Sequence, residues 1–251
     1  VVGNDHLGHG NTSKSASTDG FFAYKNGAKY VLNDLHKMTQ IAKEKYPNLP
    51  YFLMGHSMGS FFARLYAATY PNEINGLILE GTSGKVKGTN LGLFVLDILK
   101  LFKGKKAHSA LAEKFMCGSY FKYLPNSTSK VDWVVGNPEE LEKYKNNERC
   151  QIRFTVGAYY DMVKTLKKVN SKKWAKKINK DMPIILLSGA QDPVGQYGKG
   201  VCQVYCLLEK QCVKHLDLRI YSDARHEVHN ELEPAKSAFY NEVKCFIERN
   251  I

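Results

Sequence analysis

Short apolar runs alternate with longer segments of helical periodicity along much of this chain. Three of the runs are almost continuously apolar and predict buried strands, whereas the fourth alternates apolar and charged side chains, as a strand near a sheet edge does. The four runs are residues 51–54, 74–80, 183–188 and 216–221. Helices are predicted at residues 26–46, 58–70 and 234–247. This alternation predicts an α/β fold, with a mainly parallel sheet and helices on both of its faces.

The alternation stops after residue 81 and resumes at residue 183, and the intervening stretch of about 100 residues carries helical patterns and loops. A long insertion between two strands of a compact domain is often a functional lid. We therefore predict a core formed by residues 1–83 and 179–251, with a helical cap inserted at residues 84–178.

Composition excludes two classes of protein. The chain has 251 residues, of which 43% are hydrophobic and 24% charged, and these values are typical of globular domains rather than disordered or membrane-embedded chains. The longest strongly apolar stretch, residues 91–102, contains Asp97 and Lys100 and is shorter than the about 20 residues of a transmembrane helix. No signal peptide pattern is present, so we expect a cytoplasmic protein, either free or peripheral to a membrane.

The net charge of +12 is unevenly distributed along the chain. Residues 164–180 contain eight lysines and no acid, and Lys103, Lys105 and Lys106 form a second cluster. These lysines either form a solvated basic face or attract anionic lipid surfaces and acidic substrates. A nucleic-acid partner is not expected, because the lysines are not interleaved with aromatic residues and no nucleic-acid-binding motif accompanies them.

The six cysteines favour neither disulfides nor a metal site. Cys202, Cys206 and Cys212 have spacings that match neither the common zinc patterns nor a CxxC redox pair. A chain with a core of this size needs no disulfides to fold. We therefore predict free thiols in a reducing compartment, no metal and no cofactor.

The sequence GHSMG at residues 55–59 fits the G-x-S-x-G pattern and lies between a predicted strand and a predicted helix. This context identifies Ser57 as a candidate nucleophile on a sharp turn, where side chains at Gly55 and Gly59 would collide with the neighbouring strand and helix. The helix that begins near Met58 directs its dipole and the Met58 backbone N–H toward a developing oxyanion.

A serine nucleophile needs a base, and eight histidines compete for that role. His226 is preferred because it follows the last predicted strand by a short turn. His229 is the main rival, although a structural role is more common for such a histidine. His56 is expected to point away from the nucleophile. The remaining candidates without a partner signal are His36, His108 and His215.

The acid that orients the base is expected at the end of another strand. Asp192 follows the strand at residues 183–188, and the order Ser57, Asp192, His226 is the order found in α/β-hydrolases. Glu80 is the alternative acid, at the end of the preceding strand. Asp223 is too near His226 in sequence to reach its outer nitrogen comfortably.

Several motifs together resemble the monoglyceride lipase and lysophospholipase branch of the α/β-hydrolases, also described as S33 serine aminopeptidases. They are DHLGHG at 5–10, YPNLP at 46–50, GHSMG at 55–59, DWV at 132–134, CQIRFT at 150–155, SGAQDPV at 188–194 and ARHE at 224–227. The resemblance implies the α/β-hydrolase fold with its cap after the sixth strand, and the triad Ser57, Asp192 and His226. It also implies cleavage of a small acyl ester, such as a monoacylglycerol or lysophospholipid, through an acyl-enzyme.

One departure from the family pattern concerns the beginning of the chain. In this family the DHxGHG loop follows the fourth strand, so the sequence looks shortened at its beginning by about 50 residues relative to the size of the family. The second oxyanion donor is then missing from this chain, and a central strand is missing from the sheet. Because unpaired buried backbone groups cost about 1–3 kcal/mol each, we expect a preceding peptide to fill that position.

Two other functions stay open at this stage. An S33-type aminopeptidase would need an acidic pocket for the substrate amine, but the predicted cap is rich in lysine. A binding protein or inactive fragment would keep the fold without turnover, for want of the second oxyanion donor. The apolar residues 91–96 either pack on the core or contact an acyl chain or lipid surface. The sequence does not predict an oligomeric state.

Overall fold

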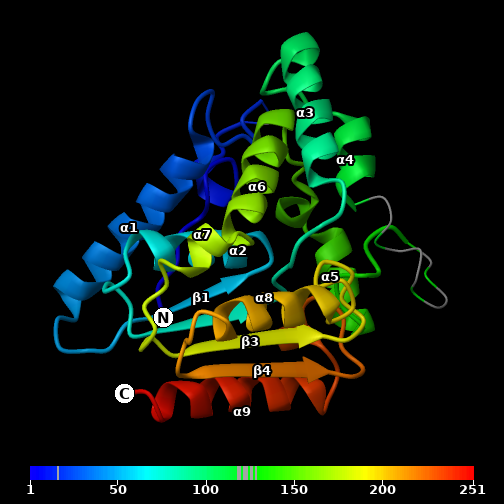
Figure 1. The fold of residues 1–251 in the computed structure, drawn as a ribbon. Helices are drawn as coiled ribbons and strands as arrows, with labels where there is room; N and C mark the ends of the chain where they lie inside the picture. The colour runs from blue at the N-terminus through cyan, green and yellow to red at the C-terminus, as the bar shows by residue number, and fades with distance from the viewer. Residues whose placement is uncertain (16, 118–119, 121–123, 125–126, 128) are drawn as a thin grey trace.

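A computed structural model describes residues 1–15, 17–117, 120, 124, 127 and 129–251. Four strands form one sheet, in the order in which they occur along the chain, and every neighbouring pair is parallel (Figure 1). The strands are β1 (Phe52–His56), β2 (Gly76–Glu80), β3 (Ile184–Gly189) and β4 (Leu216–Tyr221). All four lie where the sequence predicts strands.

Burial of the strands follows their position in the sheet. β2 and β3 are buried at every residue, as their continuous apolar runs predict. β4 is partly exposed and forms one edge, which confirms the interpretation of its alternating pattern. β1 forms the other edge, since among the described strands it pairs only with β2.

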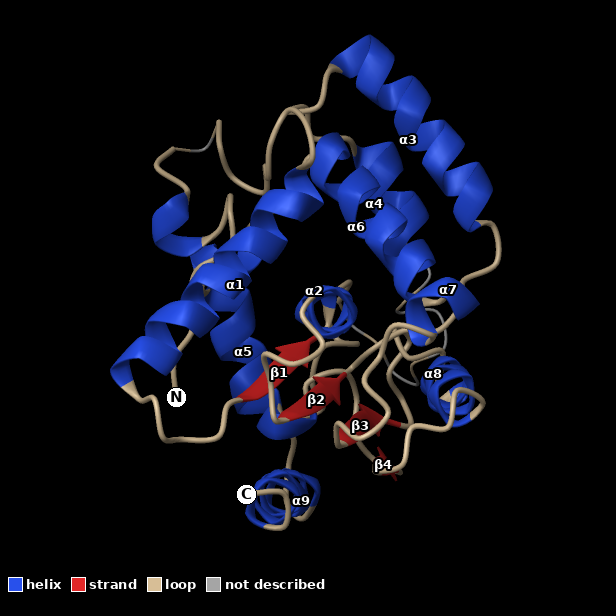
Figure 2. Cartoon of the chain, turned by 60° about the vertical axis from the view of Figure 1, so that its left-hand side comes forward, coloured by secondary structure: helices blue, strands red, loops and turns tan. Residues whose placement is uncertain are grey.

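Helices cover both faces of the sheet (Figure 2). Leu77, Leu79 and Leu186 point to the larger apolar cluster, where α2 (Met58–Thr69) and α8 (Lys199–Glu209) pack and α1 (Gly27–Lys45) covers α2. Ile78 and Ile185, which alternate with them, point to the smaller cluster beneath α9 (Ala235–Glu248). The α/β fold predicted from the alternating pattern is therefore confirmed.

The segment between β2 and β3 is helical, as predicted. It contains α3 (Thr89–Lys103), α4 (Ala110–Cys117), α5 (Pro138–Asn146), η2 (Glu148–Gln151), α6 (Val156–Val169) and α7 (Lys172–Ala175). α3, α4 and the first half of α6 share an apolar cluster of their own above the sheet (Figure 1). Leu166, Val169 and Trp174, by contrast, belong to the main core. The C-terminal end of the insertion therefore packs as part of the core, and the boundary at residue 178 stays a prediction.

A fully buried arginine connects the insertion to the core. Arg64 of α2 donates to the Val169 carbonyl (2.6 Å) and the Asn170 side-chain oxygen (3.0 Å) at the end of α6. It also donates to the Ser83 carbonyl (3.0 Å), which follows β2. Its guanidinium lies 4.6 Å from the ring of Trp174. Burial lowers the pKa of Arg64 to about 9. One side chain thus joins α2, the β2 loop and the last helices of the insertion.

In the described part of the chain, no helix is both long enough and apolar enough to cross a membrane. All six cysteines are free thiols. The cytoplasmic location stays a prediction.

Candidate active site

Ser57 occupies a strained turn between β1 and α2. Its backbone has φ 52° and ψ −124°, a conformation that costs a residue other than glycine about 1–3 kcal/mol. The Ser57 N–H donates to the Glu80 carbonyl at the end of β2 (3.0 Å), and Ser60 N–H and Oγ both donate to the Ser57 carbonyl. These bonds hold the strained turn at the carboxyl edge of the sheet, as the sequence predicts.

The two glycines of the GHSMG turn have different roles. A Cβ on Gly55 would lie 2.5 Å from the Gly59 carbonyl oxygen and 2.8 Å from Ala63 Cβ, so a side chain is excluded there. A Cβ on Gly59 would meet no described atom within 4 Å outside its own helix backbone. The expectation of a collision is confirmed at Gly55 and wrong at Gly59, because it is the backbone of Gly59 that packs against Gly55.

Met58 is the first residue of α2, so its N–H has no partner within the helix. This N–H and the positive end of the helix dipole lie next to Ser57, where they can stabilise an oxyanion. The assignment of Met58 as one donor, and the absence of the second donor from this chain, stay predictions.

Asp192 and His226 form a buried pair beyond the ends of β3 and β4. His226 Nδ1 lies 3.0 Å from Asp192 Oδ1, although the ring N–H is not well aligned with this oxygen for a hydrogen bond. Asp192 Oδ1 also accepts the Val194 N–H (2.8 Å). Burial disfavours the charged form of His226, but the charge and contact of Asp192 outweigh it, so the pKa of His226 is raised above 6.5.

The ring of His226 reaches the same sheet edge as Ser57. A Cβ on Gly81 would lie 2.7 Å from His226 Cε1, so only a glycine at the end of β2 admits this ring. His226 Nε2 is buried without a hydrogen-bond partner among the described atoms. No hydrogen bond joins Ser57 Oγ to His226 Nε2 within the described residues, and the complete triad therefore stays a proposal.

A second histidine–carboxylate pair lies beside the first. His229 Nδ1 lies 2.8 and 2.9 Å from the two carboxylate oxygens of Glu80, which is fully buried. Burial alone would raise the pKa of Glu80, but the hydrogen bond from His229 outweighs it and lowers this pKa. Burial opposes charging of His229 too, yet the bond to Glu80 raises its pKa. Glu80, the alternative acid, therefore contacts His229 through its side chain.

His56 lies between the two pairs. Its ring centroid is 4.6 Å from that of His226 and 5.3 Å from that of His229. Burial, with the charge of His226 as a smaller cause, lowers the pKa of His56 to about 4. The ring of His56 therefore packs against the candidate base, and the expectation that it points away from Ser57 stays a prediction.

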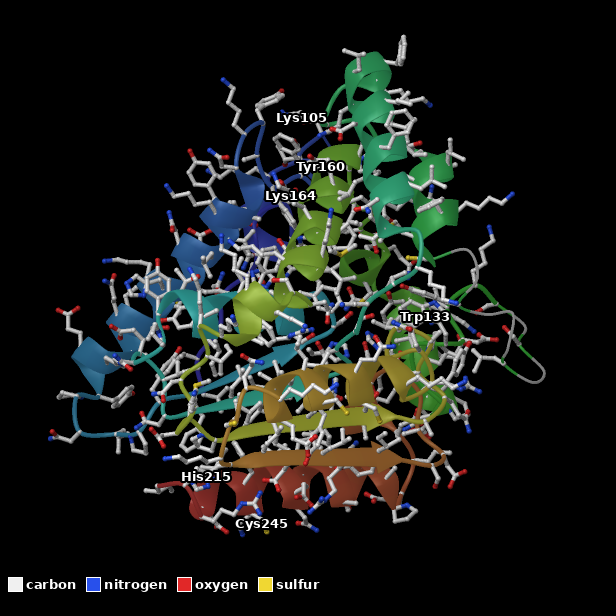
Figure 3. All side chains as sticks on the ribbon, in the orientation of Figure 1. Lys105, Trp133, Tyr160, Lys164, His215 and Cys245 are labelled. Carbon is white, nitrogen blue, oxygen red and sulfur yellow. The ribbon has the colours of Figure 1, made fainter. Side chains whose placement is uncertain are left out.

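The other polar candidates lie elsewhere. The ring of His36 stacks on Tyr70 at 3.9 Å, and His108 is exposed. His215 precedes β4, at the opposite edge of the sheet (Figure 3). Asp223 is exposed, and its carboxylate accepts a hydrogen bond from Ser222 Oγ (2.9 Å).

The insertion fixes the loop that carries His226. Arg225 Nη1 donates to the carbonyls of Asp132 (2.6 Å) and Val135 (3.1 Å). The Glu227 N–H donates to the Val134 carbonyl (2.8 Å). The ring centroid of Trp133, which is labelled in Figure 3, lies 5.1 Å from that of His226.

Sequence reasoning did not find these positioning contacts, because they join segments about 90 residues apart in sequence. The sequence marked the two segments only separately, as the DWV motif at 132–134 and the ARHE motif at 224–227. Among the described residues, no group of three or more histidine, cysteine or acidic side chains could hold a metal ion.

Comparison with known proteins decides the family. The family model described as serine aminopeptidase, S33, matches residues 1–233. This chain belongs to the S33 family of α/β-hydrolases. The fold and family that its motifs indicate are thereby confirmed.

Named relatives cover most of this S33 hydrolase. A monoglyceride lipase homolog from monkeypox virus is 26% identical over 98% of this chain and 78% of its own length. A monoacylglycerol lipase from Mycolicibacterium smegmatis is 31% identical over 91% of this chain and 71% of its own. The crystal structure of a thermostable carboxyl esterase from Bacillus coagulans, in complex with glycerol, matches 97% of this chain and 78% of its own with a TM-score of 0.88 and 32% identity.

Proposed function

We propose that this protein is a serine hydrolase that cleaves the carboxylic ester of monoacylglycerols, with Ser57, His226 and Asp192 as its triad. One observation carries the proposal: the strained Ser57 turn and the Asp192-paired ring of His226 lie at the same edge of the sheet. The relatives named monoglyceride lipase homolog and monoacylglycerol lipase, and the carboxyl esterase structure, support the ester substrate.

Each member of the triad has a defined step in this reaction. Ser57 Oγ attacks the ester carbonyl while His226 Nε2 accepts its proton, and the oxyanion receives the Met58 N–H. The imidazolium, stabilised by Asp192, then protonates the departing glycerol oxygen. Water attacks the acyl-enzyme by the same route, releasing the fatty acid and restoring Ser57.

The aminopeptidase alternative is not favoured by the charges at the site. Binding a substrate amine requires a free carboxylate, but Asp192 and Glu80 at this edge of the sheet are each paired with a histidine. Lysophospholipid esters require the same acyl chemistry as monoacylglycerols, so the triad does not discriminate between these two substrates. The strained backbone at Ser57 also favours catalysis over binding alone, because such strain is concentrated at functional sites such as active sites.

The protein as purified should hydrolyse medium- and long-chain monoacylglycerols, with loss of at least 10³-fold in kcat upon Ser57→Ala. Lysophosphatidylcholines of matched chain length and aminoacyl p-nitroanilides should be assayed in parallel. Faster turnover of the anilides would replace the esterase proposal with the peptidase. No turnover of any ester at enzyme concentrations comparable to substrate would favour the binding protein.

We further propose that the insertion contacts an anionic lipid surface from which the substrate is taken. Three side chains at helical spacing on the outer face of α3 are strongly exposed: Phe94 (61%), Leu101 (80%) and Phe102 (81%). The opposite face, with Leu96 and Leu99, is buried on α4 and α6. Within residues 91–96, Leu96 packs on the core of the insertion, whereas contact of the exposed Leu91 and Phe94 with an acyl chain or a lipid surface is part of this proposal.

The lysines at the end of α3 favour anionic over neutral lipids, because Lys103 is the last residue of this helix and Lys105 and Lys106 follow it. Sedimentation with phosphatidylglycerol vesicles tests this proposal. The triple change Phe94→Ser, Leu101→Ser and Phe102→Ser should abolish binding. The control is a serine triple at other exposed apolar positions away from α3, namely Leu49, Leu232 and Tyr240. Equal binding by the two triple variants would contradict a role for α3.

A further inference from the structure

A cavity lies away from the triad, between the start of α1 and helices α3 and α6. Its volume is about 630 Å³, and neither Ser57, Asp192 nor His226 lines it. This volume lies within the about 300–1,000 Å³ range of small-molecule sites. Its lining includes six lysines: Lys25, Lys29, Lys100, Lys105, Lys164 and Lys168.

These lysines converge from segments that are far apart in the sequence. Lys25 precedes α1 by two residues and Lys29 lies in its first turn. Lys100 lies near the end of α3 and Lys105 just beyond it, and the remaining two lie on α6. Lys105 and Lys164 are labelled in Figure 3, next to Tyr160 in the region where α1, α3 and α6 meet. A single solvated run of lysines would not converge in this way, so the arrangement is a product of the fold.

The positive charge of the cavity is only weakly compensated. Its single lining carboxylate, Asp161, accepts a hydrogen bond from the Gly27 N–H at the start of α1, and burial raises the pKa of this carboxyl. Lys100 is paired with Asp97 (2.7 Å), and its ammonium lies 3.1 Å from the centre of the Tyr160 ring. The ammonium of Lys164 lies 5.7 Å from the same ring.

Five of the six lysines have no ion pair with any acid in the described residue ranges: Lys25, Lys29, Lys105, Lys164 and Lys168. Gathering like charges in one cavity is unfavourable unless an anion joins them. Lysine ammonium groups are point-charge ligands for phosphate oxygens, and here they come from two walls, α1 on one side and α3 with α6 on the other. Leu32 and Leu65 add an apolar surface to the lining.

We propose that this cavity binds a ligand carrying two or more phosphate groups, held between the lysines of α1 and those of α6. A lipid headgroup and a soluble phosphorylated molecule offer the same chemistry, and the experiment distinguishes them. The site is separate from the triad, so the proposal does not depend on the esterase activity.

Isothermal titration calorimetry with inositol hexakisphosphate and with inorganic pyrophosphate measures the binding directly. In the triple variant Lys29→Gln, Lys164→Gln and Lys168→Gln, the affinity should fall at least tenfold. The matched control changes three exposed lysines of the same basic run outside the cavity: Lys172→Gln, Lys173→Gln and Lys176→Gln. This control variant has the same net charge as the cavity variant. Its affinity for the two phosphate probes should stay within twofold of that of the unchanged protein. Equal thermal unfolding midpoints of the two variants establish that both are folded.

Sedimentation with phosphatidylcholine vesicles containing phosphatidylinositol 4,5-bisphosphate supplies the second arm. Cavity-dependent binding of free phosphates without cavity-dependent vesicle binding identifies a soluble ligand. Cavity-dependent vesicle binding that inositol hexakisphosphate competes away identifies a headgroup. Both outcomes support the site. Equal weakening in the cavity and control variants, or no binding of any of these probes, would overturn it.

Discussion

Replacing Asp192 by asparagine changes the charge on the candidate base while nearly preserving shape. Asp192 Oδ1 contacts both the Val194 N–H (2.8 Å) and His226 Nδ1 (3.0 Å), so the amide oxygen of an asparagine can take this position and keep both contacts. The amide NH₂ then occupies the position of Oδ2, which is buried without a partner among the described atoms. The main chemical effect is therefore loss of the negative charge that stabilises imidazolium.

The size of this effect follows from the separation of the charges. Two unit charges about 4 Å apart interact by about 4 kcal/mol at an effective dielectric constant of about 20. We therefore expect Asp192→Asn to lower kcat by about 10³-fold, since each factor of ten corresponds to about 1.4 kcal/mol. The buried, unpaired NH₂ should also lower the free energy of unfolding by about 1–3 kcal/mol.

Steady-state hydrolysis of a soluble monoacylglycerol between pH 5 and pH 9 checks both the rate and its pH dependence. Asp192 raises the pKa of His226 above 6.5 against the effect of burial, so its charge is the cause that the variant removes. The acid limb of kcat/KM should therefore move to lower pH in Asp192→Asn. Asp223→Asn, which changes an exposed aspartate three residues before His226, should stay within twofold of the unchanged enzyme. A loss below tenfold in Asp192→Asn, or an unmoved acid limb, would refute the reasoning.

Three further predictions follow from the buried charged groups. In the unchanged enzyme kcat/KM should rise with pH through a midpoint above 6.5, because His226 must be neutral to accept a proton; a midpoint below 6 would contradict its assignment as base. Glu80→Gln should cost about 1–3 kcal/mol of stability by urea unfolding. Ionised Glu80, whose pKa is lowered, stabilises the native state fully above pH 4.5, and protonated His229, whose pKa is raised, stabilises it fully below pH 6.5. The loss of stability in Glu80→Gln should therefore be greatest between pH 4.5 and 6.5. A loss independent of pH would show that the pair is not ionic. Arg64→Met should lower the unfolding free energy by about 2–4 kcal/mol because it leaves buried carbonyls unpaired, and a change below 1 kcal/mol would contradict the connecting role of Arg64.

Much of the fold could be predicted because its signals are local. Apolar runs marked the four strands, and the GHSMG turn placed Ser57 between β1 and α2. α8 was not predicted, although it packs on β3 and β4 in the main core. Its sequence is at least as amphipathic at the helical period as those of α1 and α9, so the signal for this helix was present in the sequence.

The contacts that fix the site could not be predicted because they are long-range. Arg64 reaches Val169 across 105 positions, and the Arg225 side chain reaches the Asp132 carbonyl across 93. The pairing of Glu80 with His229 depends on the register of β2 against the loop after β4. The free space beside Gly59 likewise depends on how closely the backbone segments pack in three dimensions, and not on residue type. Local sequence patterns do not record these distances.

The central claim is that Ser57 is the nucleophile, and covalent labelling tests it most directly. A fluorophosphonate should increase the intact mass of the protein by one adduct, and peptide mapping should place that adduct on Ser57. Ser57→Ala should lose both labelling and monoacylglycerol hydrolysis while unfolding at a temperature close to that of the unchanged protein. Labelling or ester hydrolysis that survives in Ser57→Ala would contradict the account.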